Sequence, residues 1–319
     1  MIDALRRNRL LKSLWDWFKS FRITGILFSK LDSLLGFPVL KRKFKRHLGY
    51  PLDLNNPKSY NEKLNWRKVY DRNPLFPIVA DKYKVRRYLR KILGEKEAEK
   101  ILIPLLHVTE DPESIPFDDL PEEYVVKANN GSGTNILVTK DSDITREEII
   151  SRCKDWLRVP YGTFSHEWAY SQIRPKIIVE KLIRDEDGNI PKDYKFHVFH
   201  GRCELIQVDN GRFTNHNRSL FKKNWDYIDG SLKYIQGPDM PKPKHLSRML
   251  ELAEKIAKEF DYIRIDLYDT GKKVYAGEIT MYHGSGFERF TPEKLDFEYG
   301  KLWKIRWNKN EIIICWRFL

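Results

Sequence analysis

Seven short runs rich in valine, isoleucine and aromatic residues, beginning near residue 101, constrain the fold most strongly. Each run is bounded by glycine, proline, asparagine or aspartate, which is typical of strands. The runs are ILIPLLHV, YVVKAN, IIVEKLI, KFHVFHG, CELIQVD, YIRIDLY and VYAGEITM. Helical periodicity appears between them at 145–158 and 243–260. This pattern predicts a body of mixed helices and strands in which most strands are close neighbours along the chain.

The first 75 residues predict a basic helical extension ahead of this body. Residues 10–21 place apolar and polar side chains on opposite faces of a helix. A second helix is expected to begin near Ser59, where Glu62 completes a capping box, and residues 81–93 predict a further helix. We divide the chain into three segments: the helical extension (1–75), the body (76–303) and a basic aromatic C-terminal tail (304–319).

The positive charge of the chain is confined to its two ends. The chain holds 58 Lys and Arg against 45 Asp and Glu, a net charge of +13. Residues 1–50 carry +9 and residues 301–319 carry +4, so residues 51–300 are neutral. A nucleic-acid binder would carry its excess charge on the folded face that docks, so no nucleic-acid partner is expected. The two ends suggest contact with an anionic membrane surface, or packing of their apolar faces on the body.

Neither a disulfide framework nor a zinc site is expected, because the three cysteines lie far apart and form no CxxC pair. The longest stretch without charged residues, 128–139, has 12 residues, whereas a membrane-spanning helix needs about 20 apolar residues. No cleavable signal peptide is recognised. We therefore predict a cytoplasmic protein, and peripheral attachment to the inner face of the cell membrane stays open.

A lysine followed by a glycine loop is the first chemical signal. Lys127 ends an apolar run that leads into Gly131, Ser132, Gly133 and Thr134. Glycines let backbone N–H groups approach a phosphate, and the lysine adds a positive charge. No GK[ST] sequence follows, so this is not a Walker A loop. On its own, the segment also fits an ordinary turn.

Carboxylates in two neighbouring runs form the second signal. Arg264 and Asp266 lie in one run and Glu278 and Thr280 in the next, with a short hairpin between them. Alternation along a strand puts each pair on one face of a sheet. Such oxygen ligands suit Mg²⁺, which takes one or two carboxylates together with substrate phosphates. A cross-strand ion pair between Arg264 and Glu278 is the competing interpretation.

The third signal is a strand that ends in charged residues. The run IIVEKLI contains Glu180, Lys181 and Leu182, and Asp193 and Lys195 follow after a turn. A strand end of this kind offers backbone groups to a planar base and a nearby acid to ribose hydroxyls. A strand that simply meets solvent has the same pattern.

The order of these three signals resembles the ATP-grasp superfamily, and more narrowly the TupA-like ATP-grasp family, named for a protein of teichuronopeptide synthesis. The resemblance covers about residues 50–303. Thr280 departs from the superfamily pattern, which usually has asparagine there. The matching stretches are LDLNNPKSYNEKLNW, ADKYKVRRYL, VVKANNGSGTN, HEWAYSQIRPKIIVEKLI, DYKFHVFHG, and RIDLY followed by GEITMYHGSGFERF.

This resemblance implies an α+β ATP-grasp fold, in which two α+β lobes clasp ATP, with ATP and Mg²⁺ as cofactors. Lys195 and Arg264 are the implied catalytic residues, acting on the transferred phosphate. The implied nucleotide-binding residues are Lys127, Gly131, Ser132, Gly133 and Thr134 for the phosphates, Glu180, Lys181 and Leu182 for adenine, and Asp193 for the ribose. The implied metal ligands are Asp266, Glu278 and Thr280.

Candidate substrate residues lie in two polar loops near the metal strands. Their side chains suit a carboxylate, and each also fits a solvated loop residue. They are Arg212, Arg218, His283, Ser285 and Arg289. His166 and Glu167 match a family motif to which the chemistry assigns no role.

The resemblance implies an ATP- and Mg²⁺-dependent ligase that forms an acylphosphate and then an amide. The expected partners are a carboxylate-bearing sugar or glycan and an amine or amino acid. An amino acid joined to a uronic acid in bacterial surface polysaccharide biosynthesis, as in a capsule or cell envelope, is one example. The alternatives are a glycosyltransferase of such a pathway, with a DxD-like motif at 141–143 or 185–187, and an ATP-dependent sugar kinase.

Overall fold

A computed structural model describes residues 22–159, 161–211 and 216–305, which form two compact units. The helix predicted at 10–21 and most of the C-terminal tail lie outside the described residues. The segment boundaries predicted after residues 75 and 303 stay predictions. Among the described residues, the first unit comprises 22–41, 74–85 and 103–182, and the second comprises 42–73, 86–102 and 183–305.

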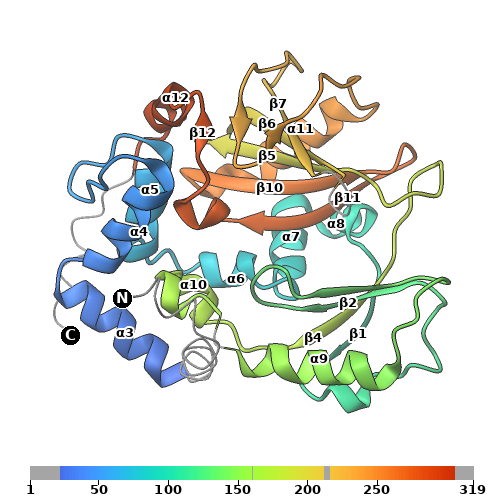
Figure 1. Ribbon diagram of the computed structural model, residues 1–319. Helices are drawn as coiled ribbons and strands as arrows, with labels where there is room; N and C mark the ends of the chain where they lie inside the picture. The colour runs from blue at the N-terminus through green and yellow to red at the C-terminus, as the bar shows by residue number, and fades with distance from the viewer. Residues whose placement is uncertain (1–21, 160, 212–215, 306–319) are drawn as a thin grey trace. The chain divides into compact units, whose positions relative to one another are not determined.

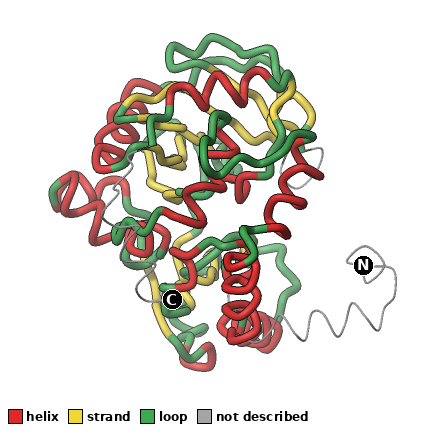
Figure 2. The backbone as a smooth tube through the Cα atoms, turned by 90° about the vertical axis from the view of Figure 1, so that its left-hand side faces the viewer, coloured by secondary structure: helices red, strands yellow, loops and turns green. Residues whose placement is uncertain are grey.

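Helices and strands are interspersed along the chain, which confirms the α+β class (Figure 1, Figure 2). Within the described ranges, no helix is both long enough and apolar enough to cross a bilayer. The α-helices are α3 (Arg22–Leu34), α4 (Pro38–Leu48), α5 (Tyr60–Tyr70), α6 (Phe76–Ala80), α7 (Val85–Leu93), α8 (Glu95–Ile101), α9 (Arg146–Arg158), α10 (Trp168–Ser171), α11 (Leu246–Ile256) and α12 (Lys294–Leu302). Short 3₁₀ turns are η1 (Pro112–Ser114), η2 (Thr163–Ser165), η3 (Ala257–Glu259) and η4 (His283–Gly286).

Capping boxes set the start of two of these helices. Ser59 Oγ accepts a hydrogen bond from Glu62 N (3.1 Å), and the Glu62 carboxylate accepts one from Ser59 N (2.9 Å), which confirms the predicted start of α5. Thr145 caps α9 in the same reciprocal way. The helix predicted from residue 81 begins only at Val85, because the Asp81 carboxylate accepts hydrogen bonds from two backbone N–H groups and holds a turn there.

The first unit contains an antiparallel sheet in the order β1-β4-β2-β3. Its strands are β1 (Leu105–Thr109), β2 (Tyr124–Ala128), β3 (Asn135–Val138) and β4 (Ile177–Lys181). Helix α9 packs on β2, and Ile149 joins Val126 and Val179 in the apolar cluster between them. The two central strands, β2 and β4, therefore bring Lys127 and Glu180 onto neighbouring strands.

The second unit contains a six-stranded sheet in the order β11-β10-β5-β6-β7-β9, parallel only between β7 and β9. Its strands are β5 (Asp193–Phe199), β6 (Arg202–Asn210), β7 (Asn217–Phe221), β9 (Ile235–Gln236), β10 (Tyr262–Asp269) and β11 (Val274–Thr280), and a small sheet pairs β8 (Ser231–Leu232) with β12 (Phe290–Thr291). Each of the seven predicted runs thus contains a strand. Helix α11 packs on this sheet against β5, β6 and β10 (Figure 1).

Helix α5 is anchored on α12 by a buried carboxylate. Asp296 is 1% exposed, and its oxygens accept hydrogen bonds from Asn61 N (2.9 Å), Asn61 Nδ2 (2.9 Å) and Tyr50 Oη (2.7 Å). Burial outweighs these hydrogen bonds and raises the pKa of Asp296 from 3.8 to about 6. The folded protein therefore holds this proton more tightly than the unfolded chain does.

Asparagine at position 296 is expected to change the pH dependence of stability, because its amide does not titrate. The wild-type carboxyl contributes stability that is fully present below pH 3.8 and is lost as the pH rises through about 6. The advantage of the wild type over Asp296→Asn in free energy of unfolding should therefore fall by about 2 kcal/mol between about pH 4 and pH 7. Urea denaturation at several pH values measures this difference.

Asp141→Asn, in an exposed turn, is the control for replacing an aspartate by asparagine. Its effect on the free energy of unfolding should stay within about 0.5 kcal/mol. An advantage of the wild type over Asp296→Asn that does not change between the two pH values would contradict the prediction.

Candidate active site

Strand register brings the predicted phosphate and metal residues together in the second unit. In β10, Arg264 lies opposite Thr280 of β11, and Asp266 lies opposite Lys195 of β5. Residues two apart on a strand share a face, so these four side chains lie on the same face of the sheet. The sequence-based expectation that Arg264 and Asp266 share a face is confirmed by this register.

A two-point ion pair joins Arg264 to Asp266. Arg264 Nε and Nη2 each lie 2.7 Å from one carboxylate oxygen. Nη2 also donates to Thr280 Oγ1 (3.0 Å) and lies 3.8 Å from the Glu278 carboxylate. Both predicted metal-binding carboxylates therefore lie beside the same guanidinium, and the competing Arg264–Glu278 pair is the longer of its contacts.

Lys195 links this pair to two further carboxylates. Its Nζ lies 3.0 Å from Asp266 Oδ2, forms a shorter ion pair with Asp193 and lies 3.9 Å from Asp209 Oδ2. Asp209 is not among the residues predicted from the sequence, because it is an isolated acid in an apolar run. Only the pairing of β6 with β5, which sets Asp209 opposite Asp193, brings it to the site.

Opposite charges set the protonation states at the centre of the site. Burial alone would raise the pKa of Asp266, but Arg264 and Lys195 outweigh it and hold the pKa below its ordinary value. Burial alone would lower the pKa of Arg264, whereas the Asp266 carboxylate raises it well above its ordinary value. Asp266 is therefore an anion at neutral pH, which is the form that binds a cation.

Buried charges continue beyond the predicted residues. Arg218 donates from Nε to Asp209 Oδ1 (2.6 Å) and from Nη1 to Glu288 Oε2 (2.8 Å). His283 Nε2 lies 3.2 Å from Glu288 Oε2, and burial lowers the pKa of His283, which favours the neutral ring. The buried carboxylates of this network are Asp193, Asp209, Asp266 and Glu288, and its buried cations are Lys195, Arg218 and Arg264. The half-exposed Lys233 also lies 3.0 Å from Glu288 Oε1, so four cations face these four carboxylates.

The donor atoms of this face suit Mg²⁺. Asp266, Glu278 and Thr280 offer only oxygen, and Mg²⁺ usually takes one or two protein carboxylates when phosphates supply further ligands. Within the described ranges, no group of three or more His, Cys, Asp or Glu side chains is placed to hold a metal by itself. The residues fit a cation that is shared with a phosphate.

The glycine loop of the first unit has a geometry that suits a phosphate. Gly131 and Gly133 both have a φ of +75°, a backbone conformation that favours glycine. A Cβ at Gly131 would lie 2.5 Å from the Tyr161 ring, whereas nothing lies within 4 Å of a Cβ at Gly133. Thr134 Oγ1 is buried and has no hydrogen-bond partner in the described structure. The loop therefore offers open space beside its backbone and an unsatisfied hydroxyl, while Ser132 Oγ lies 2.9 Å from Tyr161 Oη.

Two lysines of the first unit lie at this loop and its strand. Lys127 Nζ lies 2.8 Å from Glu180 Oε2 on the neighbouring strand, so the predicted phosphate-binding and adenine-binding residues are in contact. Lys82, which the sequence places in a helix without a role, donates from Nζ to Gly131 O and from its backbone N to Asn129 O (2.9 Å). Lys82 is therefore a second cation beside the glycine loop.

The predicted adenine-binding segment ends the first unit. Lys181 is exposed, and its backbone N donates to Pro104 O (3.0 Å). Leu182 is buried and is the last residue of the first unit. This segment lies where the chain passes from one unit to the other. Its role in adenine binding stays a prediction.

The predicted substrate residues lie in different surroundings. Arg218 is buried and paired with two carboxylates, and His283 is buried against α5. The Ser285 carbonyl accepts a hydrogen bond from a lysine of α5 (2.7 Å), and the Arg289 side chain is 56% exposed. Arg212 lies outside the described residues. Their role in substrate binding stays a prediction.

The histidine of the HEWAY motif supports the fold of the first unit. His166 Nε2 lies 2.9 Å from Asp32 Oδ2, and its Nδ1 lies 2.9 Å from Ser29 Oγ. Asp32 also accepts hydrogen bonds from the backbone N–H groups of Val39 (2.8 Å) and Leu40 (3.3 Å) at the start of α4. His166 therefore joins α3 and the start of α4 to η2, a structural role that the motif alone does not indicate.

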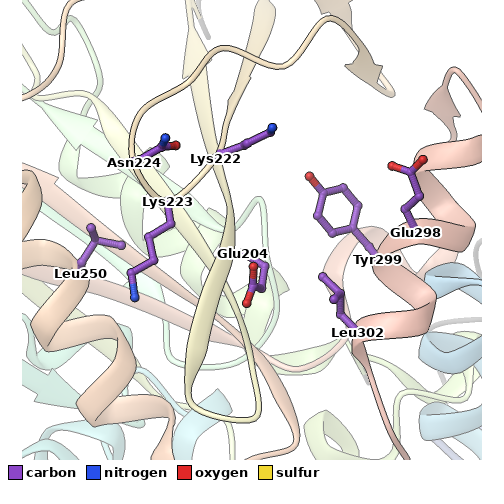
Figure 3. Close-up of a pocket in the computed structure, with 8 residues that line it drawn as sticks. All are labelled: Glu204, Lys222, Lys223, Asn224, Leu250, Glu298, Tyr299 and Leu302. Carbon is purple, nitrogen blue, oxygen red and sulfur yellow. The ribbon is translucent and has the colours of Figure 1, made fainter.

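A pocket of about 600 Å³ in the second unit shares no residue with the predicted site (Figure 3). One of its lysines, Lys223, is paired with Glu254 (2.8 Å). The pocket is lined by Glu204, Lys222, Lys223, Asn224, Leu250, Glu298, Tyr299 and Leu302. We assign no part of the nucleotide site to it.

Comparison with known families identifies the chain. The profile of the TupA-like ATP-grasp family matches residues 62–304. The chain belongs to the TupA-like ATP-grasp family. The match confirms the resemblance drawn from the motifs, and the matched residues include parts of both units. No curated protein matches the sequence significantly.

Solved ligase structures align with this TupA-like protein at low identity. D-alanine–D-alanine ligase from Bacillus anthracis, complexed with ATP, matches with 18% identity and a TM-score of 0.37 over 64% of this chain and 54% of its own. D-alanine–D-alanine ligase from Helicobacter pylori matches with 16% identity and a TM-score of 0.39 over 72% of this chain and 62% of its own. Phosphoribosylamine–glycine ligase from Thermotoga maritima matches with 13% identity and a TM-score of 0.41 over 65% of this chain and 48% of its own. The aligned part thus covers less than two thirds of each solved protein.

Removal of the buried lysine is expected to destabilise the second unit strongly. In Lys195→Met, the carboxylates of Asp193 and Asp266 lose a cation that each contacts. The free energy of unfolding should fall by about 3–5 kcal/mol, as is typical when one partner of a buried ion pair is removed. Urea denaturation of the full chain measures the change.

Lys192→Met is the matched control, because Lys192 is exposed just before β5. Its free energy of unfolding should stay within about 0.5 kcal/mol of the wild type. A loss for Lys195→Met as small as that of the control would contradict the role of Lys195 in the buried network.

Proposed function

We propose that this TupA-like ATP-grasp protein is an ATP- and Mg²⁺-dependent carboxylate–amine ligase. The observation that carries the proposal is the buried cluster of Arg264, Asp266 and Lys195, with Glu278 beside it, in a chain of this family. Lys127 and the glycine loop provide a second set of phosphate-binding groups on the other unit.

The first unit supplies most of the proposed nucleotide contacts. Lys127 and the loop at 131–134 bind the β- and γ-phosphates through the ammonium group and backbone N–H groups. The segment 180–182 contacts adenine, and Asp193 of the second unit binds the ribose hydroxyls. This assignment is supported by the open space at Gly133 and the unsatisfied hydroxyl of Thr134.

The buried face of the second unit acts on the transferred phosphoryl group in this proposal. Mg²⁺, once bound, would supply positive charge that neutralises the phosphates. Asp266 and Glu278, with Thr280, are the residues that would hold it. Lys195 and Arg264 orient the phosphoryl oxygens and stabilise the charge that develops on them.

The proposed reaction has two steps and needs no protein nucleophile. A carboxylate oxygen of the substrate attacks the γ-phosphorus of ATP, the bond between that phosphorus and the β–γ bridging oxygen breaks, and ADP leaves. The amine of the second substrate then attacks the acyl carbon of the acylphosphate, phosphate leaves, and the nitrogen loses a proton to give the amide. The protein contributes position and charge.

We further propose that the carboxylate belongs to a sugar or glycan and that the amine is an amino acid or related amine. The family name supports bacterial surface polysaccharide biosynthesis as the setting, and a uronic acid is the carboxylate that fits it. The location proposed for the protein is the cytoplasm, at the inner face of the cell membrane, with the basic ends touching the membrane. The experiments below distinguish the ligase from the glycosyltransferase and from the sugar kinase.

Variants in each unit test the proposed nucleotide-binding and metal-binding residues. Purified protein with Mg·ATP, a panel of uronic acids and a panel of amines should form ADP, and titration calorimetry should detect nucleotide binding. Glu278→Ala and Lys127→Ala should each lower Mg²⁺-dependent ADP formation by about 100-fold or more, because each removes charge stabilisation at the phosphates.

Glu251→Ala and Lys140→Ala remove exposed charges from the same two units and are the controls. Both should retain wild-type activity. Full activity in either Glu278→Ala or Lys127→Ala would disprove the role proposed for that residue, and a protein that binds UDP-sugars but no ATP would favour the glycosyltransferase.

Hydroxylamine distinguishes a ligase from a sugar kinase. An acylphosphate reacts with hydroxylamine to give a hydroxamate and phosphate, whereas a phosphate ester on a hydroxyl does not. In the presence of ATP and an active uronic acid, but without amine, the protein should therefore produce a hydroxamate in an amount matching the ADP formed. ADP formation with a stable sugar phosphate and no hydroxamate would overturn the ligase in favour of the kinase.

A further inference from the structure

Helix α3, the turn after it and the start of α4 leave large apolar side chains exposed. Of the large apolar side chains exposed in the described structure, six lie between residues 26 and 39. We call these six the α3 surface; their exposed fractions are 40% for Ile26, 60% for Leu27, 59% for Leu31, 71% for Leu34, 66% for Leu35 and 36% for Val39. Leu27, Leu31 and Leu34 follow the spacing of one helix face. Exposed apolar side chains gathered in this way mark an interaction surface.

The opposite side of α3 is already packed in the first unit. The Phe28 ring lies 5.6 Å from the Phe164 ring, measured between centroids. Ser29 and Asp32 both bond to His166. These contacts fix the orientation of the helix about its axis, so the α3 surface faces away from the η2 segment on which α3 packs.

Every exposed ionised side chain between residues 24 and 48 is basic. The acid in this stretch, Asp32, is 2% exposed and is bonded to His166 and to the start of α4. Apolar side chains flanked by lysine and arginine are typical of elements that lie in the interface of a membrane. Within the first unit, the exposed basic residues of this stretch are Lys30 on α3 and Lys41 on α4.

The charge argues against three other occupants of the α3 surface. A second copy of the chain would bring the same positive charge. By sequence, residues 1–21 carry +3 and residues 306–319 carry +2, so the charge of neither end complements the positive charge of the surface. An anionic bilayer complements both features, because its headgroups attract the basic residues and its acyl chains accept the apolar ones.

We propose that the α3 surface binds the headgroup region of an anionic lipid bilayer. The leucines enter the boundary between headgroups and acyl chains, and Lys30 and Lys41 lie near the lipid phosphates. This contact lies within described residues and is separate from the contact proposed for the two ends of the chain. It does not depend on the ligase activity, since none of its residues belongs to the nucleotide site.

Flotation of the full chain with lipid vesicles tests the proposal. Wild-type protein should bind vesicles of phosphatidylcholine with about 30% phosphatidylglycerol, and should bind vesicles of phosphatidylcholine alone more weakly by about tenfold or more. The variant Leu27→Gln/Leu31→Gln/Leu34→Gln should bind the anionic vesicles with a partition coefficient at least about tenfold lower than the wild type. Glutamine keeps the helix propensity high, and circular dichroism checks the fold.

The matched control replaces three exposed apolar residues elsewhere, as Val159→Gln/Ile190→Gln/Ile235→Gln, and should bind like the wild type. If the triple leucine variant does not fold, the single variant Leu34→Glu, at the most exposed leucine of the surface, should show the same loss. Wild-type binding by the leucine variants would overturn the proposal. Equal binding of the wild type to anionic and neutral vesicles would also overturn the proposal. The same holds if the wild type binds no vesicles and forms a dimer that the leucine variants convert to monomer.

Discussion

The antiparallel pairing of β5 with β10 is the constraint on which the candidate site depends. It sets Lys195 opposite Asp266, so an ammonium group and a carboxylate meet in the buried part of the sheet. A slip of one residue would turn Lys195 to the other face of β5 and put Phe196 among the charges. The ion pairs and the register therefore support each other, because a slip of one residue would bury neither the charges nor the apolar residues favourably.

One stretch that matches the family, residues 52–66, contains most of helix α5 and has no evident catalytic residue; its role is structural. Asn61 Nδ2 donates to Glu288 O (2.9 Å) and Asn65 Nδ2 donates to Gly286 O (2.8 Å). The Lys68 ammonium donates to Ser285 O (2.7 Å). The helix thus holds the loop that follows β11, and with it the Glu288 carboxylate that pairs with Arg218. Residues far from the motifs in sequence fix the position of the buried charges.

Much of the site could be read from the sequence because its signals are local. A glycine loop after a strand, and acids two residues from a partner on one strand, are spacings within single elements. Asp209, Glu288 and Lys82 carry no such signal. Each reaches the site only through contacts with segments that are distant in the sequence.

The sequence by itself determined the types of the elements, two of the helix starts and the order of the motifs, because periodicity, capping boxes and turn residues act over a few neighbouring positions. The tertiary structure decided which charges meet and which apolar face stays uncovered. Arg264 pairs most closely with Asp266 and not with Glu278, and the leucines of α3 remain outside while Phe28 packs inside. Both outcomes depend on strand register and on packing between distant segments, where burial and charge are balanced across the whole unit.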